Sequence, residues 1–127
     1  MMRRLALGCV VACLSLSAGA EVSFSTDVVP ILRLHCVGCH MTGAEPGGLQ
    51  LHPGMAYESL VKAQAQTAPM LRVTPGDAEH SYLLHKLQGT HLDVGGNGVR
   101  MPFAMAPLSS AELKLIQTWI TEGAHKN

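Results

Sequence analysis

The chain has 127 residues and a formal net charge of zero, which is enough for one domain and no more. It has no basic patch and no run of like charges, so its composition excludes a nucleic-acid-binding protein. Aromatic residues make up only 4% of the chain, and Trp119 is its only tryptophan. A domain of this size with few large rings has a modest core of its own.

Residues 1–20 have the pattern of a cleaved signal peptide. Two arginines at 3–4 precede an apolar stretch over 5–16, and Ala18-Gly19-Ala20 forms a cleavage site before Glu21. The apolar stretch is short for a bilayer span and lacks stop-transfer flanks, so we expect no membrane span. The pattern predicts export to a bacterial periplasm and a single domain over residues 21–127.

A lipoprotein box at residues 10–13, with Cys13 as the lipidated residue, is an alternative to simple cleavage. Cleavage before Cys13 would leave a very short apolar region, and the better cleavage site at Ala18-Gly19-Ala20 would go unused. A lipid anchor at Cys13 is therefore the less favoured interpretation. Cleavage after Ala20 would remove Cys9 and Cys13. Only Cys36 and Cys39 would then remain, which is few for the disulfide framework of an exported domain.

A first helix is predicted directly ahead of Cys36. Ser25 or Thr26 can cap it, and Pro30 falls in its first turn, where a missing N–H costs little. Four residues recur there at the spacing of one helix face: Val28, Ile31, Leu32 and His35.

Residues 36–40 read Cys-Val-Gly-Cys-His, the attachment signature of a c-type haem. Cysteines three apart on a helical turn lie on one face and can reach both vinyl groups of one porphyrin edge. His40 stands on the same side, where a neutral imidazole can bind the iron. We therefore expect one covalent haem c attached through Cys36 and Cys39, with His40 as the first axial ligand. A buried porphyrin would also supply apolar bulk.

Two other uses of this cysteine pair remain open. It could be a redox dithiol, although no βαβ pattern surrounds it. It could also form a Cys2His2 zinc site with His40 and His52, although three ligands within five residues would be crowded. Thioether bonds to haem would use both sulfurs, which fits an exported protein.

The segment from 41 to 76 is predicted to be mostly loop. Glycines and prolines punctuate residues 41–54, where we expect a carbonyl to accept a hydrogen bond from the second nitrogen of His40. Leu49 and Leu51 are expected to pack on the same face of the haem. Residues 55–65 are predicted to form a short helix.

The second half of the chain contains two predicted helices and a long loop. Asp77 is expected to cap a helix that ends at Gly89, and residues 90–107 show no regular pattern. Ser109 and Glu112 form a capping box for the last helix. The apolar stripe and stop of that helix are Leu113, Ile116, Trp119, Ile120 and Gly123. The predicted fold is all-α, with three or four short helices and long loops.

The second axial ligand decides between electron transfer and ligand chemistry. Met101 is favoured because glycines precede it and Pro102 follows, which would let the chain approach the haem closely and then stiffen. A thioether ligand favours ferrous iron. Met105 and His91 are rivals in the same loop, and Met101 could instead be a core filler. Arg72 and Arg100 could pair with the haem propionates.

Several segments together resemble the planctomycete-type cytochrome c domain. They are residues 24–32, 36–40, 47–51, 75–83, 100–102 and 115–124, and they cover nearly all of 22–124 in that family's order. The resemblance implies a class I-like cytochrome c fold with Cys36 and Cys39 attached to haem and with His40 and Met101 as axial ligands. The sequence departs from the family at Ala78, where proline is common, and in standing alone rather than fused to other modules.

These features predict a periplasmic monohaem cytochrome that carries single electrons and is not itself an enzyme. Its expected partners are redox proteins that dock transiently, with the chain acting as a monomer or as a subunit of a redox complex. Two alternatives stay open. One is a haem-based sensor in which Met101 is displaced by a ligand, and the other is a haem subunit of an exported dehydrogenase or oxidase.

Overall fold

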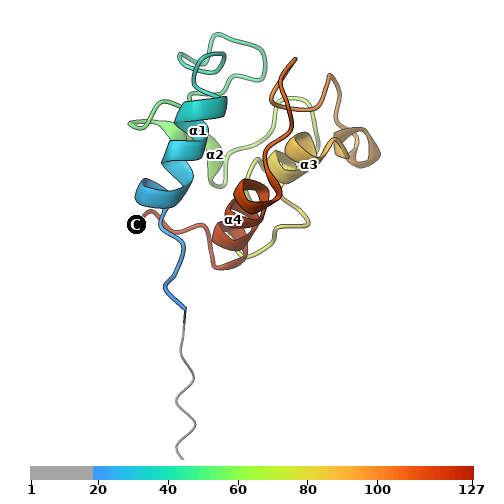
Figure 1. Ribbon diagram of the computed structural model, residues 1–127. Helices are drawn as coiled ribbons and strands as arrows, with labels where there is room; N and C mark the ends of the chain where they lie inside the picture. Colours follow the sequence, from blue (N-terminus) through green and yellow to red (C-terminus); the bar gives the residue numbers. More distant parts are fainter. Residues whose placement is uncertain (1–18) are drawn as a thin grey trace, which may run out of the picture.

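The computed structural model describes residues 19–127, so most of the predicted signal peptide over 1–20, with Cys9 and Cys13, lies outside the described residues. The helices are α1 (Val29–His35), α2 (Ala56–Leu60), α3 (Tyr82–Gln88) and α4 (Ser110–Thr121), with short helical turns η1 (Phe24–Val28) and η2 (His91–Val94). Residues 19–127 contain isolated β-bridges but no strand, so the all-α prediction with short helices and long loops is confirmed (Figure 1). No helix in this part of the chain has the length and apolar character needed to cross a bilayer.

The first helical segment begins earlier than predicted. Its cap is Ser23, not Ser25 or Thr26, because the Ser23 hydroxyl accepts a hydrogen bond from the Thr26 amide at 3.2 Å. The Asp27 carboxylate in turn accepts one from the Ser23 amide at 2.8 Å. The first of these hydrogen bonds has the spacing of a capping box. The second, from Ser23 to Asp27, reaches one residue further, which fits the wider π-helical turn of η1.

The predicted helix over 55–65 is wrong in its second half. Helix α2 ends at Leu60, Val61 is extended, and Lys62 has a φ of 59°. The cause is a backbone pairing with a later segment, in which the Lys62 amide donates to the Val73 carbonyl at 2.9 Å. The Val73 amide donates back to the Leu60 carbonyl at 3.1 Å, so the chain leaves the helix to pair with residues 71–73.

Helix α3 ends at Gly89 as predicted, with a left-handed φ of 81°, but it does not begin at Asp77. The Asp77 carboxylate closes a separate turn by accepting the His80 amide at 3.0 Å. Ser81 is fully buried and stabilises this turn through two hydrogen bonds. Its hydroxyl donates to the Asp77 carbonyl at 2.7 Å and accepts from the Thr74 amide at 2.8 Å. The helix therefore starts only after Ser81.

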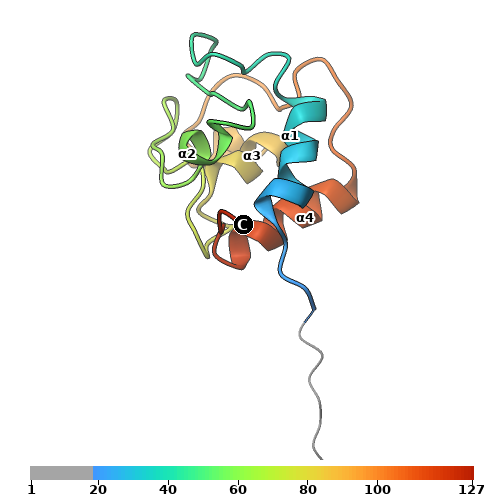
Figure 2. The ribbon, with the colours of Figure 1, turned by 90° about the vertical axis from the view of Figure 1, so that its left-hand side faces the viewer.

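Helix α4 has the predicted capping box of Ser109 and Glu112, with both reciprocal hydrogen bonds formed. Its buried Trp119 packs against Phe24, with ring centroids 5.1 Å apart, and so joins the last helix to η1. Figures 1 and 2 show the end of the chain beside η1, where the Asn127 carbonyl accepts the Ser25 amide at 2.9 Å. The first and last helical segments thus share one core.

Candidate functional site

A cavity of about 500 Å³ lies between the end of α1, helix α3 and the loops on either side. Cofactor and ligand sites in proteins commonly span about 300–1,000 Å³. The residues Cys36, Cys39, His40 and Met101, which the sequence predicted to act together, all line this cavity. Leu49 and Leu51 line it too, so the loop after His40 stays beside the motif as expected.

The short turn that carries the motif continues directly from α1. The Cys36 amide donates to the Leu32 carbonyl at 2.9 Å, and the His40 amide donates to the Cys36 carbonyl at 3.0 Å. Helix α1 ends at His35, and the turns that follow it keep both cysteines and the histidine at the same cavity. The local fold is therefore the one that the spacing of the motif requires.

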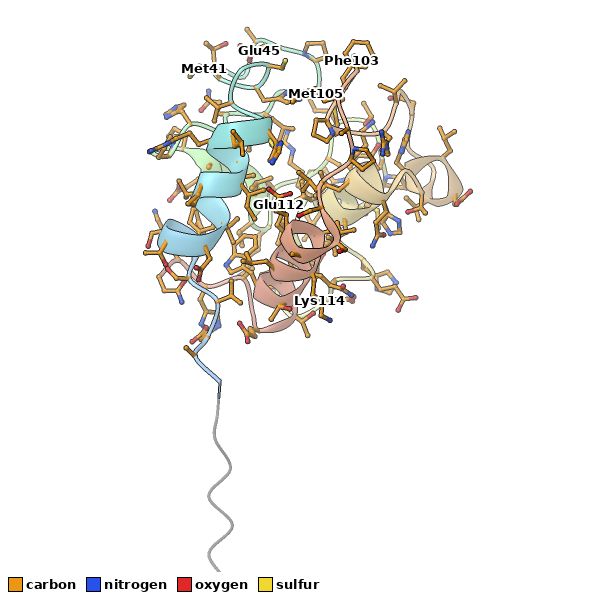
Figure 3. All side chains as sticks on the ribbon, in the orientation of Figure 1. Met41, Glu45, Phe103, Met105, Glu112 and Lys114 are labelled. Atoms are coloured by element: carbon orange, nitrogen blue, oxygen red, sulfur yellow. The ribbon has the colours of Figure 1, made fainter. Side chains whose placement is uncertain are left out.

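The three candidates for the second axial ligand occupy different places. Met101 is half-buried against the core, and its amide is fixed to the Lys86 carbonyl of α3 at 2.9 Å. Met105 also lines the cavity but is 52% exposed, at the loop tip with Phe103 (Figure 3). His91 is buried away from the cavity lining, with Nε2 3.1 Å from the Gly98 carbonyl. The geometry thus favours Met101 over both rivals.

The imidazole of His40 is in the state that a metal ligand needs. Burial lowers its pKa, and the positive charges of Arg72 and Lys86 act in the same direction against the opposing effect of Glu45. The ring is therefore neutral at neutral pH. Its Nδ1 atom is buried and has no hydrogen-bond partner.

The expected carbonyl partner for the His40 ring is absent from residues 41–54, so that prediction is wrong. The loop folds back onto the backbone of His40 instead, because the Leu51 amide donates to the His40 carbonyl at 2.8 Å. A buried imidazole nitrogen without a partner is costly unless something else binds it. Within residues 19–127, Nδ1 of His91 is equally without a partner, but His40 lines the cavity and His91 does not, so the His40 ring is the one available to a metal ion of a cofactor bound there.

Cys36 does not have the properties of the nucleophilic cysteine of a redox pair. Burial, reinforced by the negative charge of a Cys39 thiolate, raises the pKa of Cys36 to about 11. A reactive cysteine pair needs the opposite shift, since the thiolate is the nucleophile. The zinc alternative also loses support, because no three His, Cys, Asp or Glu side chains in residues 19–127 come together as a metal site. His52 does not complete one.

Two cations face the cavity, and no Asp or Glu side chain is part of the lining. The Arg72 guanidinium donates to the carbonyl oxygens of Ser59 and Gly47, both at 2.7 Å. The Lys86 ammonium donates to two carbonyls of the 97–99 segment at 3.0 and 2.7 Å. Both charges are held by neutral groups, so the cavity favours a ligand that carries negative charge.

Some of the charged and aromatic residues that line the cavity were predicted from the sequence, and others were not. Arg72 lines the cavity, as a residue near haem propionates would, whereas Arg100 does not. Lys86, His35 and Phe103 also line the cavity, although no sequence pattern assigned them to the site. Lys86 and His35 sit on helices, and only the tertiary arrangement turns them towards the motif. The position of His35, directly before Cys36, was the one available signal.

Comparison with known proteins adds no identification, because no protein-family model, curated protein or solved structure matches the chain. The fit of the site to its implied cofactor therefore rests on the chemistry of the residues that line the cavity. A pair of sulfurs on one turn, a neutral imidazole, a thioether, apolar walls and two cations all fit a covalently attached haem with its anionic propionates. We find no residue in the lining that conflicts with this group.

Proposed function

We propose that this chain is a periplasmic monohaem c-type cytochrome with a class I-like fold, acting as a one-electron carrier. The observation that supports the proposal is that Cys36, Cys39, His40 and Met101 line a single cavity although the methionine is distant from the motif in sequence. The half-buried position of Met101 and the neutral state of the His40 imidazole are the properties that the two axial ligands need.

A haem bound here would supply an iron that changes oxidation state by one electron. The chain's own residues would hold and tune that group. Cys36 and Cys39 would fix the porphyrin edge, while Leu49 and Leu51 would exclude water beside His40. The cations described above would offset negative charge on the cofactor. An iron held by both His40 and Met101 would offer no free position to a substrate, so we propose a carrier and not an enzyme.

The proposed partners are redox proteins that dock briefly beside the cavity. Phe103 and Met105 line the cavity and are 65% and 52% exposed, so an apolar contact is available where an electron would enter or leave. The same arrangement would serve a free carrier and a haem subunit of an exported oxidoreductase, because both need an accessible cofactor edge.

The decisive experiment is absorbance-monitored potentiometry of the protein purified from a host that matures c-type cytochromes. A pyridine haemochrome spectrum should report one haem, and the ferric protein should show the weak near-infrared band of a sulfur–iron bond. Met101→Ala should abolish that band, lower the reduction potential and allow rapid binding of carbon monoxide to the ferrous form.

Met105→Ala is the matched control, since it removes a methionine from the same loop and the same cavity wall. It should keep the near-infrared band and a near-normal potential. Loss of the band in this variant rather than in Met101→Ala would transfer the ligand role to Met105. Rapid carbon monoxide binding by the unmodified ferrous protein would favour the sensor, and the absence of a haemochrome would end the cytochrome proposal.

A further inference from the structure

Lys86 contacts the segment that leads to Met101 at several successive points. It is half-buried on α3 and lines the cavity. Its ammonium donates to the Asn97 carbonyl at 3.0 Å and to the Val99 carbonyl at 2.7 Å. Its own carbonyl accepts the Met101 amide at 2.9 Å. One residue of a helix therefore holds this segment both before Met101 and at Met101 itself.

The carbonyl between those two is held by a second side chain. Nε2 of His91, in the turn η2 that follows α3, lies 3.1 Å from the Gly98 carbonyl oxygen. A carbonyl oxygen only accepts, so the ring nitrogen is the donor. Three successive carbonyls, those of residues 97–99, thus accept hydrogen bonds from side chains of α3 and η2. The path of the segment is therefore set by these two elements.

No ion pair explains the position of the Lys86 ammonium. Within residues 19–127 it lies at no carboxylate, and no Asp or Glu side chain lines the cavity. Hydrogen bonds from a charged donor are about twice as strong as neutral ones. The segment it holds contains glycines at 95, 96 and 98, so it has little stiffness of its own. The ammonium thus supplies strong contacts where the backbone is most in need of them.

We propose that Lys86 is the positioning residue for Met101, and that its two hydrogen bonds to residues 97 and 99 keep the thioether in place for the cofactor. This inference rests on the proposed function. Lys86 does not bind the iron itself, because it acts through the segment that carries the methionine. Removal of the ammonium would take away two of the four hydrogen bonds described above. Met101 would then leave the iron more often and open the axial position to external ligands.

The test compares Lys86→Leu with Lys86→Arg in the holoprotein. Leucine keeps part of the apolar stem, suits a helix and cannot bind iron, whereas arginine keeps a charge and several donors. In Lys86→Leu, the ferrous form should bind carbon monoxide about tenfold faster or more, because loss of a hydrogen bond to a charged group changes an equilibrium by about that factor. The sulfur–iron band of the ferric form should also be lost at a lower temperature. Lys86→Arg should restore most of both properties.

Lys114→Leu is the matched control for the loss of a charge. Lys114 is exposed on α4 and lies outside the cavity lining, and Figure 3 shows it far from Phe103 and Met105. This variant should keep the band and the slow binding of carbon monoxide. Since carbon monoxide is uncharged, a change of charge in the cavity would not by itself accelerate its binding.

Hydrogen exchange of the Met101 amide, followed by nuclear magnetic resonance, is a readout that does not depend on ligand binding. In the unmodified protein this amide should be protected by its bond to Lys86, and in Lys86→Leu it should exchange about tenfold faster or more. Amides in the middle of α4 should be unaffected. The measurement on the unmodified protein tests the contact whether or not Lys86→Leu folds.

Three results would overturn the inference. They are an unprotected Met101 amide in the unmodified protein, Lys86→Leu with the carbon monoxide rate and exchange rate of the unmodified protein, and Lys86→Arg as fast as Lys86→Leu. Any of these with a normal haemochrome spectrum would leave the cytochrome proposal intact. A missing haemochrome in the unmodified protein would remove both.

Discussion

Replacement of Gly96 by alanine should damage the loop that carries one wall of the cavity. A Cβ atom at this position would lie 2.6 Å from the His91 carbonyl oxygen and 2.8 Å from Cε2 of Tyr82. Neither neighbour can move freely, because the His91 carbonyl accepts the Gly96 amide at 2.8 Å and the buried Tyr82 is hydrogen-bonded to Thr67. Overpacking of this kind costs about 1–3 kcal/mol.

The loop after Gly96 supplies the carbonyls that hold Lys86, so displacement of the loop would also loosen that contact. With a lost backbone hydrogen bond adding about 1 kcal/mol, we expect the free energy of unfolding to fall by about 2–4 kcal/mol. The thermal midpoint should fall by about 10 °C or more for a domain of this size. Circular dichroism of the holoprotein during heating and during guanidinium titration measures both quantities.

Gly54→Ala is the matched control for this substitution. Its Cβ would lie at an ordinary contact distance of 3.5 Å from the His52 ring, and its φ is not left-handed. This variant should be neutral or slightly more stable, by at most about 1 kcal/mol, because alanine restricts the unfolded chain. If Gly96→Ala were as stable as Gly54→Ala, the argument that close packing fixes this wall of the cavity would be wrong.

Three further predictions concern the ends of the helices. Ser109→Ala removes the hydroxyl that accepts the Glu112 amide at 3.2 Å, and urea titration should show a loss of about 1 kcal/mol. Because hydrogen bonds from His35 and Ser109 lower the pKa of Glu112 to about 2 in the folded protein, its contribution to stability is present above its usual pKa of 4.5 and is lost as the pH falls towards 2. Glu112→Gln should therefore reduce the loss of stability between pH 5 and 2, and an unchanged acid profile would contradict this. Tyr57→Phe removes a hydrogen bond of 2.8 Å to the Ala124 carbonyl and should lower the free energy of unfolding by about 1 kcal/mol in the same urea assay.

The elements that were predicted correctly are those whose signals lie within a few residues of one another. The capping box of α4 and the glycine that ends α3 are local features, and both are present. The start of α3 was misplaced because an aspartate can close a turn as readily as it can cap a helix. Buried Ser81, whose partners lie at Thr74 and Asp77, decides between these roles.

Backbone pairing between segments that are distant in the sequence could not be predicted from local sequence patterns. The helix expected over 55–65 stops at Leu60 because residues 61–64 pair with residues 71–73. The apolar residues of the predicted helix could not reveal this pairing, because a short apolar run suits either conformation. The absence of a carbonyl partner for the His40 ring is of the same kind, since it depends on how the following loop folds back.

The residues of the candidate site could be predicted where they lie close together in the sequence or form a recognisable short motif. The Cys36–His40 motif specifies two sulfurs and an imidazole on one turn, and the Met101-Pro102 pair suggested the second ligand. The cations and His35 could not be assigned in this way, because their roles depend on where α1 and α3 face the cavity. The motif thus indicated the cofactor, and the structure indicated which charges would surround it.

The distribution of aromatic rings explains how a chain with so few of them can keep such a cavity. Phe24, Tyr57 and Trp119 form one cluster, with centroid distances of 5.1 to 6.5 Å, and none of the three lines the cavity. They join η1, α2 and α4 into a frame with its own core. The opposite half is held by the hydrogen bonds of Arg72 and Lys86 to loop carbonyls, which shape its walls without filling the space between them. A cofactor that binds only the folded state would therefore add stability where side chains contribute least, while the aromatic frame would hold the motif in position to receive it.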